Sequence, residues 1–283
     1  MEIIKGISEM HKKAKEFRLN GMKIGFVPTM GALHEGHLSL MRRARLDNDI
    51  VVISIYVNPI QFGPLEDYKT YPRDLESDAK KAQDVGVDII FAPMDKEMYQ
   101  DKFSTFVEVE NLTSVLEGRS RPSHFKGVTT VVCKLFNIVK PDVTYFGQKD
   151  YQQALVIKRM IRDLNFDIEL QVLPIIRDKD GLALSSRNNY LSEKERRSAT
   201  ILFECLQKAR ELLENGERDS SKILHEMRSM IEKRELVNID YVEIVDSENL
   251  ERIPWVKGEL LVALAVRIGK TRLIDNMLWS ENK

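Results

Sequence analysis

The chain has few cysteines, no long apolar run and almost no net charge, and each of these shortages excludes a class of protein. Its two cysteines, Cys133 and Cys205, lie in apolar stretches that are predicted to be helical. This is typical of buried thiols in a reducing compartment, not of a disulfide framework or a zinc site. No run of about 18 apolar residues is present, so we expect no membrane span. The N-terminus lacks an uninterrupted apolar region, so we expect no signal peptide and a cytoplasmic location.

The net charge of −1 argues against wholesale binding to nucleic acid or to an anionic membrane. Two common nucleotide-binding motifs are also missing. Gly269-Lys270-Thr271 resembles the end of a P-loop, but Leu264 stands where that motif needs its first glycine. No Gly-x-Gly-x-x-Gly follows a predicted strand, so a nicotinamide cofactor is not indicated.

Apolar runs alternate with amphipathic stretches through the first part of the chain. Runs rich in Val, Ile and Phe predict strands at Ile24–Val27, Ile50–Val57, Val87–Ala92, Val143–Phe146 and Ile168–Ile176. The stretches between them predict helices at Leu38–Asp47, Asp74–Val85, Val128–Val139 and Asp150–Leu164. This alternation predicts an α/β fold with a parallel sheet that is covered on both faces. Ligands bind outside the carboxyl ends of such strands, so we expect the segments that follow the strands to converge on one crevice.

The pattern changes after about Ile176. Ser192-Glu193-Lys194-Glu195 predicts a capping box that opens a helix to about Asn215, and a second helix is expected from Asp219 or Ser220 to about Lys233. Short runs with polar turns follow, at Asp240–Val245, Glu259–Val266 and Arg272–Met277. We therefore predict two domains: residues 1–176 with the parallel sheet, and residues 177–283 as a smaller antiparallel α+β domain.

One alternating segment, Phe103–Val109, lies outside this scheme. Phe103, Thr105, Val107 and Val109 would share one face of a strand. Two interpretations stay open: an edge strand that pairs with a second copy of the chain, or a surface hairpin within one subunit.

The most informative segment is Pro28-Thr29-Met30-Gly31-Ala32-Leu33-His34-Glu35-Gly36-His37, which joins a predicted strand to a predicted helix. A helix N-terminus favours phosphate because its backbone N–H groups and its dipole point toward the ligand. His34 and His37 add donors for charge that develops on phosphates in an in-line displacement. A shared metal ion, or two plain surface histidines, are the alternatives, and no cysteine cluster supports the metal. The segment predicts a site for a nucleoside triphosphate.

Two further turns follow predicted strands. Gln61 carries an uncharged amide that can bind a hydroxyl or a carboxylate, although an exposed loop amide is an equally simple interpretation. Lys149 is a compact cation suited to phosphate oxygens, and otherwise a surface lysine. Asp150 can cap the helix that follows, and Gln153 lies one turn into that helix on the same side.

The junction between the two predicted domains carries the hydroxyls of Ser185 and Ser186 beside Arg187. These groups can hold triphosphate oxygens and close on a bound nucleotide, and the simpler alternative is a polar linker. A carboxylate of the helix at 74–85 is a candidate to share Mg²⁺ with phosphate, but spacing alone does not select Asp78 from its acidic neighbours. Together the polar turns favour nucleotidyl transfer, which needs positioning and charge neutralisation but no covalent nucleophile.

The chain resembles the pantothenate synthetase (pantoate–β-alanine ligase) family over nearly its full length. The resemblance rests on the segment Pro28–His37 and on five more motifs in the same order: Val57-Asn58-Pro59-Ile60-Gln61-Phe62-Gly63, Tyr71-Pro72-Arg73, Arg121-Pro122-Ser123-His124-Phe125-Lys126-Gly127-Val128, Phe146-Gly147-Gln148-Lys149-Asp150 and Leu184-Ser185-Ser186-Arg187-Asn188. The His-x-Gly-His element alone is shared more widely, with cytidylyltransferase-like enzymes and class I aminoacyl-tRNA synthetases.

The resemblance implies an AMP-forming ligase that joins (R)-pantoate to β-alanine with ATP and Mg²⁺. Pantoate attacks the α-phosphorus to give pantoyl adenylate and pyrophosphate, and the β-alanine amine then displaces AMP to give pantothenate. It also implies a Rossmann-like N-terminal domain, a smaller C-terminal domain that acts as a lid, and a homodimer.

The resemblance also implies roles for individual residues. Contacts to the ATP phosphates are expected from His34, His37, Lys149, Ser185, Ser186 and Arg187. The nucleotide crevice is expected to be lined by Pro28, Met30 and Leu184, with Gly147 and Asp150 at the ribose. Pantoate is expected to bind Gln61 and Gln153, and Asp78 is similar to the carboxylate linked to Mg²⁺. The segment Arg121–Gly127 is expected to be a flexible wall over the cleft, and Ser123, where relatives often carry Gly, is expected to stiffen it.

Two other classes of function compete with this one. A nucleotidyltransferase acting on a phosphate ester would need a second cationic cluster, and the sequence shows no clear one. A nucleotide sensor or RNA-binding protein could keep the histidine site without turnover, but the near-zero net charge and the lack of repeated aromatic and basic residues argue against RNA.

Overall fold

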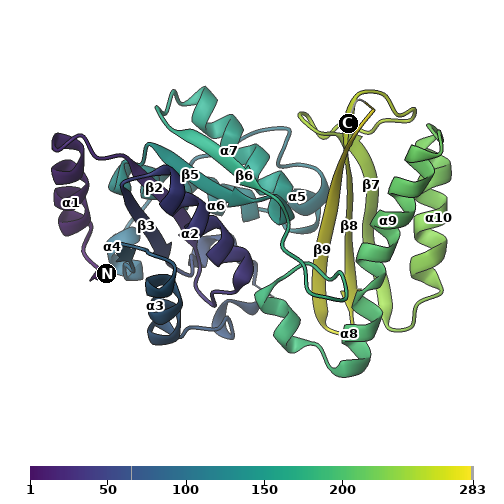
Figure 1. The fold of residues 1–283 in the computed structure, drawn as a ribbon, viewed down its shortest axis with the longest axis horizontal. Helices are drawn as coiled ribbons and strands as arrows, with labels where there is room; N and C mark the ends of the chain where they lie inside the picture. The colour runs from purple at the N-terminus through teal and green to yellow at the C-terminus, as the bar shows by residue number, and fades with distance from the viewer. Residues whose placement is uncertain (65, 282–283) are drawn as a thin grey trace. The chain divides into compact units, whose positions relative to one another are not determined.

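The structure, a computed structural model, describes residues 1–64 and 66–281 and consists of two units (Figure 1). Unit 1 comprises Met1–Gln148 and Gln152–Pro174, and unit 2 comprises Lys149–Tyr151 and Ile175–Lys283. The sequence predicts a single boundary at 176/177, close to the one after Pro174. It does not indicate that the three residues Lys149–Tyr151 group with unit 2.

Unit 1 is built on a six-stranded sheet in which every neighbouring pair of strands is parallel. The strands are β1 (Glu2–Ile4), β2 (Ile24–Thr29), β3 (Ile50–Ile55), β4 (Ile89–Phe91), β5 (Val143–Gly147) and β6 (Glu169–Leu173), in the order β1-β4-β3-β2-β5-β6. Chain order runs outward from β2 through β3 to β4 in one direction and from β5 to β6 in the other, which is the doubly wound arrangement, and β1 is added at the edge beside β4. The predicted α/β class is confirmed, and the switch in strand order falls between β2 and β5.

Helices and short turns connect these strands. The longer helices are α1 (Ile7–Leu19), α2 (Glu35–Asp47), α3 (Leu75–Asp84), α6 (His124–Val139) and α7 (Tyr151–Asp163). The shorter elements are α4 (Asp95–Met98), α5 (Leu116–Ser120), η1 (Pro59–Gln61), η2 (Asp67–Lys69) and η3 (Gln148–Asp150). Among the described residues, no helix is long and apolar enough to cross a membrane.

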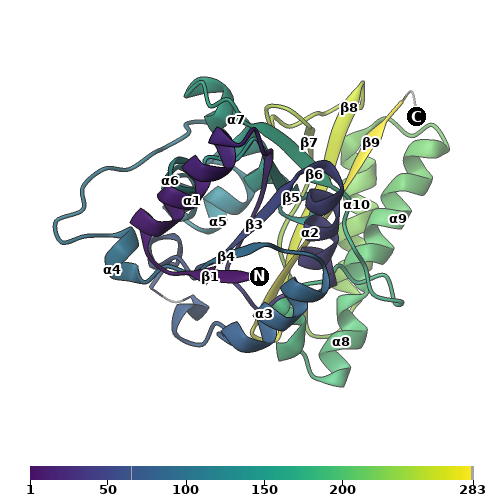
Figure 2. The same cartoon turned by 60° about the vertical axis from the view of Figure 1, so that its left-hand side comes forward.

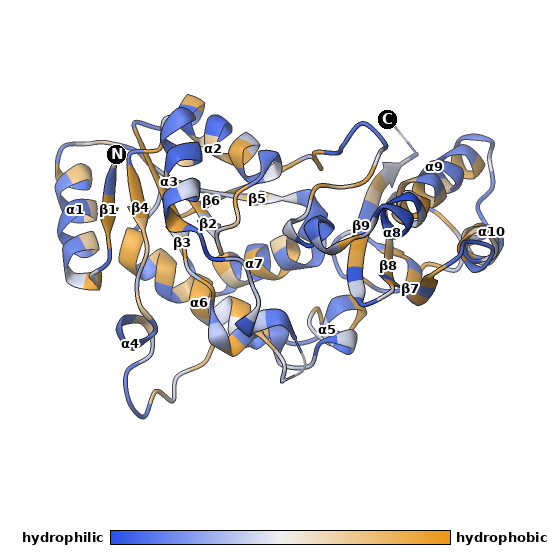
Figure 3. Cartoon of the chain, turned by 90° about the horizontal axis from the view of Figure 1, so that it is seen from below, coloured by the Kyte–Doolittle hydropathy of each residue, from blue (hydrophilic) through white to orange (hydrophobic). Residues whose placement is uncertain are grey.

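Successive side chains of the central strands pack on opposite faces of the sheet. Val52 of β3 belongs to a cluster with residues of α1, α6 and α7, whereas Val51 and Ile53 belong to a second cluster with residues of α2 and α3. This alternation is the period of two expected of a strand. Figure 3 shows the resulting pattern, with apolar strands and helices that are apolar on one side and polar on the other.

The segment Phe103–Val109 forms no strand. It belongs to the connection between α4 and α5, which Figure 2 shows projecting from the rest of unit 1. Its backbone is held by hydroxyls of α6: Val107 N–H donates to Thr130 Oγ1 over 3.0 Å, and Thr129 Oγ1–H donates to the Val107 carbonyl over 2.6 Å. The hairpin interpretation is therefore wrong, and pairing with a second copy stays a prediction.

Unit 2 contains the antiparallel sheet that the sequence predicts. Its strands β7 (Val237–Asp246), β8 (Glu259–Ile268) and β9 (Thr271–Ser280) lie in chain order, and a hydrophobic cluster joins them to the helices α8 (Glu193–Ala199), α9 (Ile201–Glu214) and α10 (Ser220–Glu232). Ser192 and Glu195 form the predicted capping box. The helix expected from there to Asn215 is instead two helices, with Thr200 between them.

Candidate active site

The turn after β2 is shaped by a buried carboxylate from α3. Asp78 is 2% exposed, and its two oxygens accept the backbone N–H groups of Ala32 and Leu33, each over 2.8 Å. Gly31 has a φ of 83°, and a Cβ there would lie 2.9 Å from Asp78 Oδ2, so the turn requires a glycine. Asp78 thus fixes the path of the chain between β2 and α2.

The two histidines of this segment close the first turn of α2 against each other. His34 is the N-cap, and its Nδ1 accepts the Gly36 N–H over 3.2 Å. His37 Nδ1 accepts the His34 N–H over 3.3 Å, which completes a capping box made of two imidazoles. The ring centroids lie 4.1 Å apart. This local pattern explains why α2 begins at Glu35, before the predicted start at Leu38.

This geometry fixes the tautomer of both imidazoles. A nitrogen that accepts a hydrogen bond carries no proton, so in the neutral ring the proton resides on Nε2. His34 and His37 therefore both present Nε2–H as a donor. Gly36 makes this possible, because a Cβ at that position would lie 2.9 Å from His34 Cε1 and 3.0 Å from its Nδ1.

The structure corrects one expectation about the backbone. The sequence predicts outward-pointing N–H groups for phosphate at this helix N-terminus, but most of those donors already have acceptors within the protein. Gly31 N–H donates to Thr29 Oγ1, and the N–H groups of His37 and Leu38 donate to the His34 carbonyl. The candidate donors of this turn are therefore its side chains and not a set of backbone N–H groups.

Gln61 lies at the end of η1, on the segment that follows β3, and its amide is held in one orientation. Asn58 Nδ2 donates to Gln61 Oε1 over 3.0 Å, so the Gln61 NH₂ group is directed elsewhere and donates to Met30 Sδ over 3.2 Å. Asn58 is itself oriented, because its Oδ1 accepts the Tyr99 hydroxyl over 2.8 Å and its Nδ2 also donates to the Gly127 carbonyl over 3.1 Å. Sequence reasoning quoted Asn58 within a motif but missed this role.

A second set of contacts holds the backbone of the same segment. His124 Nδ1 lies 2.9 Å from the Gln61 carbonyl, and its Nε2 lies 3.0 Å from Arg121 Nη1. Arg121 in turn makes a two-point contact with Glu66, through Nε to Oε1 over 2.6 Å and Nη2 to Oε2 over 2.7 Å. Glu66 Oε2 accepts the Gly63 N–H over 3.3 Å. The contacts run from Gln61 outward and return to the chain at Gly63.

The segment Arg121–Gly127, which the resemblance implies to be a flexible wall, is not a loop throughout. Helix α6 begins at His124, and His124, Phe125 and Gly127 are buried. A Cβ on Gly127 would lie 2.6 Å from Gln61 Cα and 2.7 Å from Gln61 N, so this turn packs directly on η1. Ser123 has a φ of 68°, a left-handed conformation that glycine adopts without strain.

His124 is held in its neutral form. Its pKa is lowered to about 4, first because burial penalises the imidazolium and then because the Arg121 cation lies beside it. Glu66 and Glu117 act in the opposite direction with smaller effect. The neutral ring suits both neighbours, because Nδ1–H can donate to the Gln61 carbonyl while Nε2 accepts from Arg121.

The remaining predicted residues of unit 1 lie at or near strand ends. Pro28 is in β2, Met30 follows that strand directly, and Gly147 is the last residue of β5. Gln153 is half-buried in the first turn of α7. Its neighbour Gln152 is buried and acts structurally, accepting the Glu117 N–H and donating to the carbonyls of Leu112 and Val115.

Lys149 belongs to unit 2, where β9 holds its backbone. Asn276 Nδ2 donates to the Lys149 carbonyl over 2.9 Å, and Asn276 N–H donates to Asp275 Oδ1. Asp275 is 2% exposed and makes a two-point contact with Arg177 over 2.6 and 2.9 Å. Burial raises the pKa of Asp275, against the opposing effect of Arg177. Sequence reasoning missed Asn276, because 127 residues separate it from its partner.

The other predicted residues of unit 2 lie in two turns. Asp150 is exposed beside Lys149, with Oδ1 3.9 Å from Lys149 Nζ. Ser185 is the N-cap of η4 (Ser186–Tyr190), and its Oγ accepts the Arg187 N–H over 3.3 Å. Leu184, Ser185, Ser186 and Arg187 are all half-buried, so their side chains are partly accessible.

Asp78 belongs to no cluster of metal-ligating side chains among the described residues. In the part of the chain that the structure describes, no group of three or more His, Cys, Asp or Glu side chains could hold a metal ion. Asp78 already accepts a backbone N–H on each oxygen, and Mg²⁺ is usually held by one or two carboxylates together with substrate phosphates. This geometry suits Asp78 to shaping the turn.

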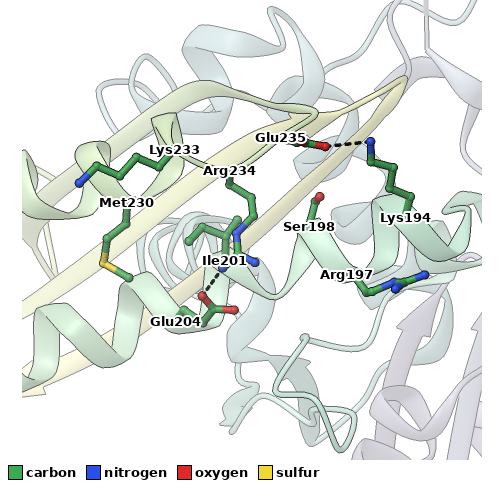
Figure 4. A pocket seen from close by; sticks show the side chains of 9 residues that line it. All are labelled: Lys194, Arg197, Ser198, Ile201, Glu204, Met230, Lys233, Arg234 and Glu235. Carbon is green, nitrogen blue, oxygen red and sulfur yellow. Dashed lines mark hydrogen bonds and ion pairs between the residues drawn. The ribbon is translucent and has the colours of Figure 1, made fainter.

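A cavity of about 800 Å³ lies in unit 2, and none of the predicted site residues lines it. Residues of α8, α9 and α10 and of the turn after α10 line it (Figure 4). Four of its charged side chains form ion pairs with each other, Lys194 with Glu235 and Arg234 with Glu204. Because these opposite charges are already paired within the cavity, we assign the cavity no part in the reaction.

The fold is that of an α/β protein with a doubly wound parallel sheet, and His34 and His37 follow β2, one of the two strands at its switch point. The model of the family Pantoate-beta-alanine ligase matches residues 2–278. The pantothenate synthetase of Pelotomaculum thermopropionicum is 57% identical over 281 residues, covering 99% of this chain and 100% of that protein. That of Caldicellulosiruptor bescii is 54% identical over 278 residues, covering 98% and 99%.

Solved structures agree with the sequence comparison. Pantothenate synthetase from Thermus thermophilus superposes with a TM-score of 0.92 at 45% identity, covering 98% of this chain and 99% of that one. Pantoate-β-alanine ligase from Francisella tularensis, solved with β-γ ATP and β-alanine, gives a TM-score of 0.81 at 36% identity over 98% and 97%. The chain belongs to the pantoate–β-alanine ligase family, and its reaction is the ATP-dependent condensation of pantoate with β-alanine.

Replacing Gly36 with Ala tests the imidazole geometry. The added methyl group collides with the His34 ring, which must swing away and lose its bond to the backbone. Alanine favours a helix over glycine by roughly 0.5–1 kcal/mol, which offsets much of the roughly 1 kcal/mol lost with the cap bond, so we expect stability to change little. Activity should fall by about tenfold or more. Steady-state rates and urea unfolding check both parts, with exposed Glu35→Gln as control, and unchanged activity in Gly36→Ala would contradict the assigned geometry.

Acid should destabilise unit 1 through His124. Its folded-state pKa of about 4 lies below the ordinary 6.5, so the unfolded chain binds the extra proton. The contribution of His124 to the free energy of unfolding is therefore fully present above pH 6.5. It is lost as the pH falls toward 4, by about 3 kcal/mol in total. Urea unfolding of the parent and of His124→Asn between pH 4 and 7 should show a steeper loss in the parent. Parallel curves would rule this out.

Proposed function

We propose that the chain makes pantothenate in two steps, through a pantoyl adenylate. The pantoate carboxylate attacks the α-phosphorus of ATP, forming a C–O–P link while the bond to pyrophosphate breaks. The β-alanine amine then attacks the acyl carbon, and AMP leaves with the electron pair of the broken C–O bond. The observation that carries this proposal is the pair of imidazoles held with Nε2–H as donor, at the carboxyl end of β2 beside the switch point.

The histidines are suited to the first step. Negative charge moves onto the leaving pyrophosphate as the bond breaks, and preorganised donors stabilise that charge better than mobile water does. Removing one such donor typically raises the barrier by roughly 3–4 kcal/mol. We assign to His34 and His37 contacts with the phosphates, and the same to Lys149, Ser185, Ser186 and Arg187. We place Pro28, Met30 and Leu184 at the nucleotide, with Gly147 and Asp150 at its ribose.

The amides are suited to the acceptor. Gln61 presents an NH₂ group whose direction is set by Asn58, and we assign to it the pantoate oxygens, together with Gln153. A neutral amide orients a carboxylate without the strong attraction of a cation, so the carboxylate stays nucleophilic. Substrate bound here would displace the Gln61 contact with Met30 Sδ. Exclusion of water would protect the adenylate once it forms.

Mg²⁺ and the oligomer belong to the same proposal. We propose that Mg²⁺ enters with ATP as its phosphate complex, since no cluster of protein ligands is found in the described residues. Asp78 then acts by holding the turn at Ala32 and Leu33. We also propose a homodimer, for which the connection between α4 and α5, with Phe106 46% exposed, offers an uncovered surface.

The test is pyrophosphate release from ATP and Mg²⁺. Pantoate alone should release roughly one pyrophosphate per site, and β-alanine should convert this burst into continuous turnover. We expect His37→Ala and Lys149→Ala to fold normally and to lose adenylation by roughly a hundredfold or more. Gln153→Ala should weaken the use of pantoate and leave ATP binding nearly intact.

Each arm of this experiment can fail separately. If pyrophosphate appears with a phosphate ester and not with pantoate, the chain is a nucleotidyltransferase of another kind. If neither acceptor releases pyrophosphate while ATP still binds, a nucleotide sensor is the better description. Unchanged rates in both His37→Ala and Lys149→Ala would overturn the assigned phosphate contacts, and an equal loss of ATP affinity in Gln153→Ala would overturn its assignment to pantoate.

A further inference from the structure

We propose that His124 is a positioning residue for the acceptor site, holding the Gln61 backbone so that the Gln61 amide meets pantoate at one fixed place. This inference rests on the proposed function, because it takes Gln61 to be a ligand of pantoate. His124 itself is assigned no contact with any substrate.

The first support is the closed path of contacts around Gln61. His124 Nδ1–H donates to the Gln61 carbonyl, Arg121 donates to His124 Nε2, and Glu66 joins Arg121 to the Gly63 N–H. The path leaves the chain at Gln61 and returns two residues later. This ring of contacts holds the end of η1, and the contact between His124 and the Gln61 carbonyl is its direct link to Gln61.

The second support is that the path is well shielded. His124 is 9% exposed, and the side chains of Arg121 and Glu66 are 15% and 24% exposed. Ion pairs and hydrogen bonds in such surroundings are screened less by water than surface pairs are. Breaking one member of the path leaves the others with unmatched polar groups, so each side chain supports the rest.

The third support is a division of labour between side chains. Asn58 orients the Gln61 side-chain amide, whereas His124 holds the Gln61 backbone. Gly127 lets the first turn of α6 approach η1 closely enough for both contacts, since Asn58 also donates to its carbonyl. Catalytic amides must be held within a fraction of an ångström to be useful, and two independent anchors serve that need.

Two conservative variants separate the contacts of the ring. An Asn side chain places its amide nitrogen near the position of Nδ1, so His124→Asn keeps the donor to the Gln61 carbonyl. A Gln side chain reaches the position of Nε2, so His124→Gln keeps a partner for Arg121 and loses the donor to Gln61. Thr129→Val serves as control, because it removes buried hydrogen bonds of the same helix to Val107 and Phe125 without touching η1.

The experiment measures KM for pantoate, KM for ATP and kcat, with pantoate affinity by calorimetry as a second readout. We expect His124→Gln to raise KM and Kd for pantoate by about tenfold or more, with KM for ATP unchanged. His124→Asn should stay within about threefold of the parent. Thr129→Val should lose stability with no change in either KM.

The outcomes separate this inference from the function on which it rests. If the parent protein releases no pyrophosphate with pantoate, the proposed function fails before any variant is compared. If the parent is active and His124→Gln keeps the parental KM for pantoate, the positioning role is overturned. Equal increases in KM for pantoate and ATP, or the same increase in Thr129→Val, would also overturn it, because each would show a merely structural effect.

Discussion

The site in unit 1 depends on two imidazole nitrogens that accept hydrogen bonds from the backbone. His34 Nδ1 binds the Gly36 N–H, and His37 Nδ1 binds the His34 N–H. These bonds cap α2, so the first turn of the helix and the orientation of both rings are one structure. The same bonds leave the proton of each neutral ring on Nε2. A helix cap thereby becomes a pair of preorganised donors, placed by the sheet at its switch point.

At each turn that carries a candidate residue, a buried polar side chain holds the turn by hydrogen bonds. Asp78 holds the turn before the histidines, Asn58 and His124 hold Gln61, and Asn276 holds the Lys149 carbonyl. None of these partners needs to touch a substrate. Buried polar groups must find partners, and here the partners they find are the turns that carry the candidate residues. Precision at the site is built from hydrogen bonds that also stabilise the fold.

Much of unit 1 could be predicted from the sequence because its signals are local. Apolar runs and turn residues located β2, β3 and β5, and the class of fold is confirmed. Local patterns could not show that Asp78, 45 and 46 residues away, captures the turn, nor that Asn276 reaches Lys149. They also failed where tertiary contacts overrule periodicity, as at residues 103–109, which hydroxyls of α6 hold outside any strand.

The tautomers of His34 and His37 test the central claim most directly. Nitrogen chemical shifts of ¹⁵N-labelled imidazole, measured by NMR in the free protein at neutral pH and assigned with His34→Gln and His37→Gln, report which ring nitrogen carries the proton. We expect both rings to be protonated on Nε2, with Nδ1 showing the shift of an unprotonated acceptor. A proton on Nδ1 of either ring would contradict the account, because that nitrogen could not then accept from the backbone.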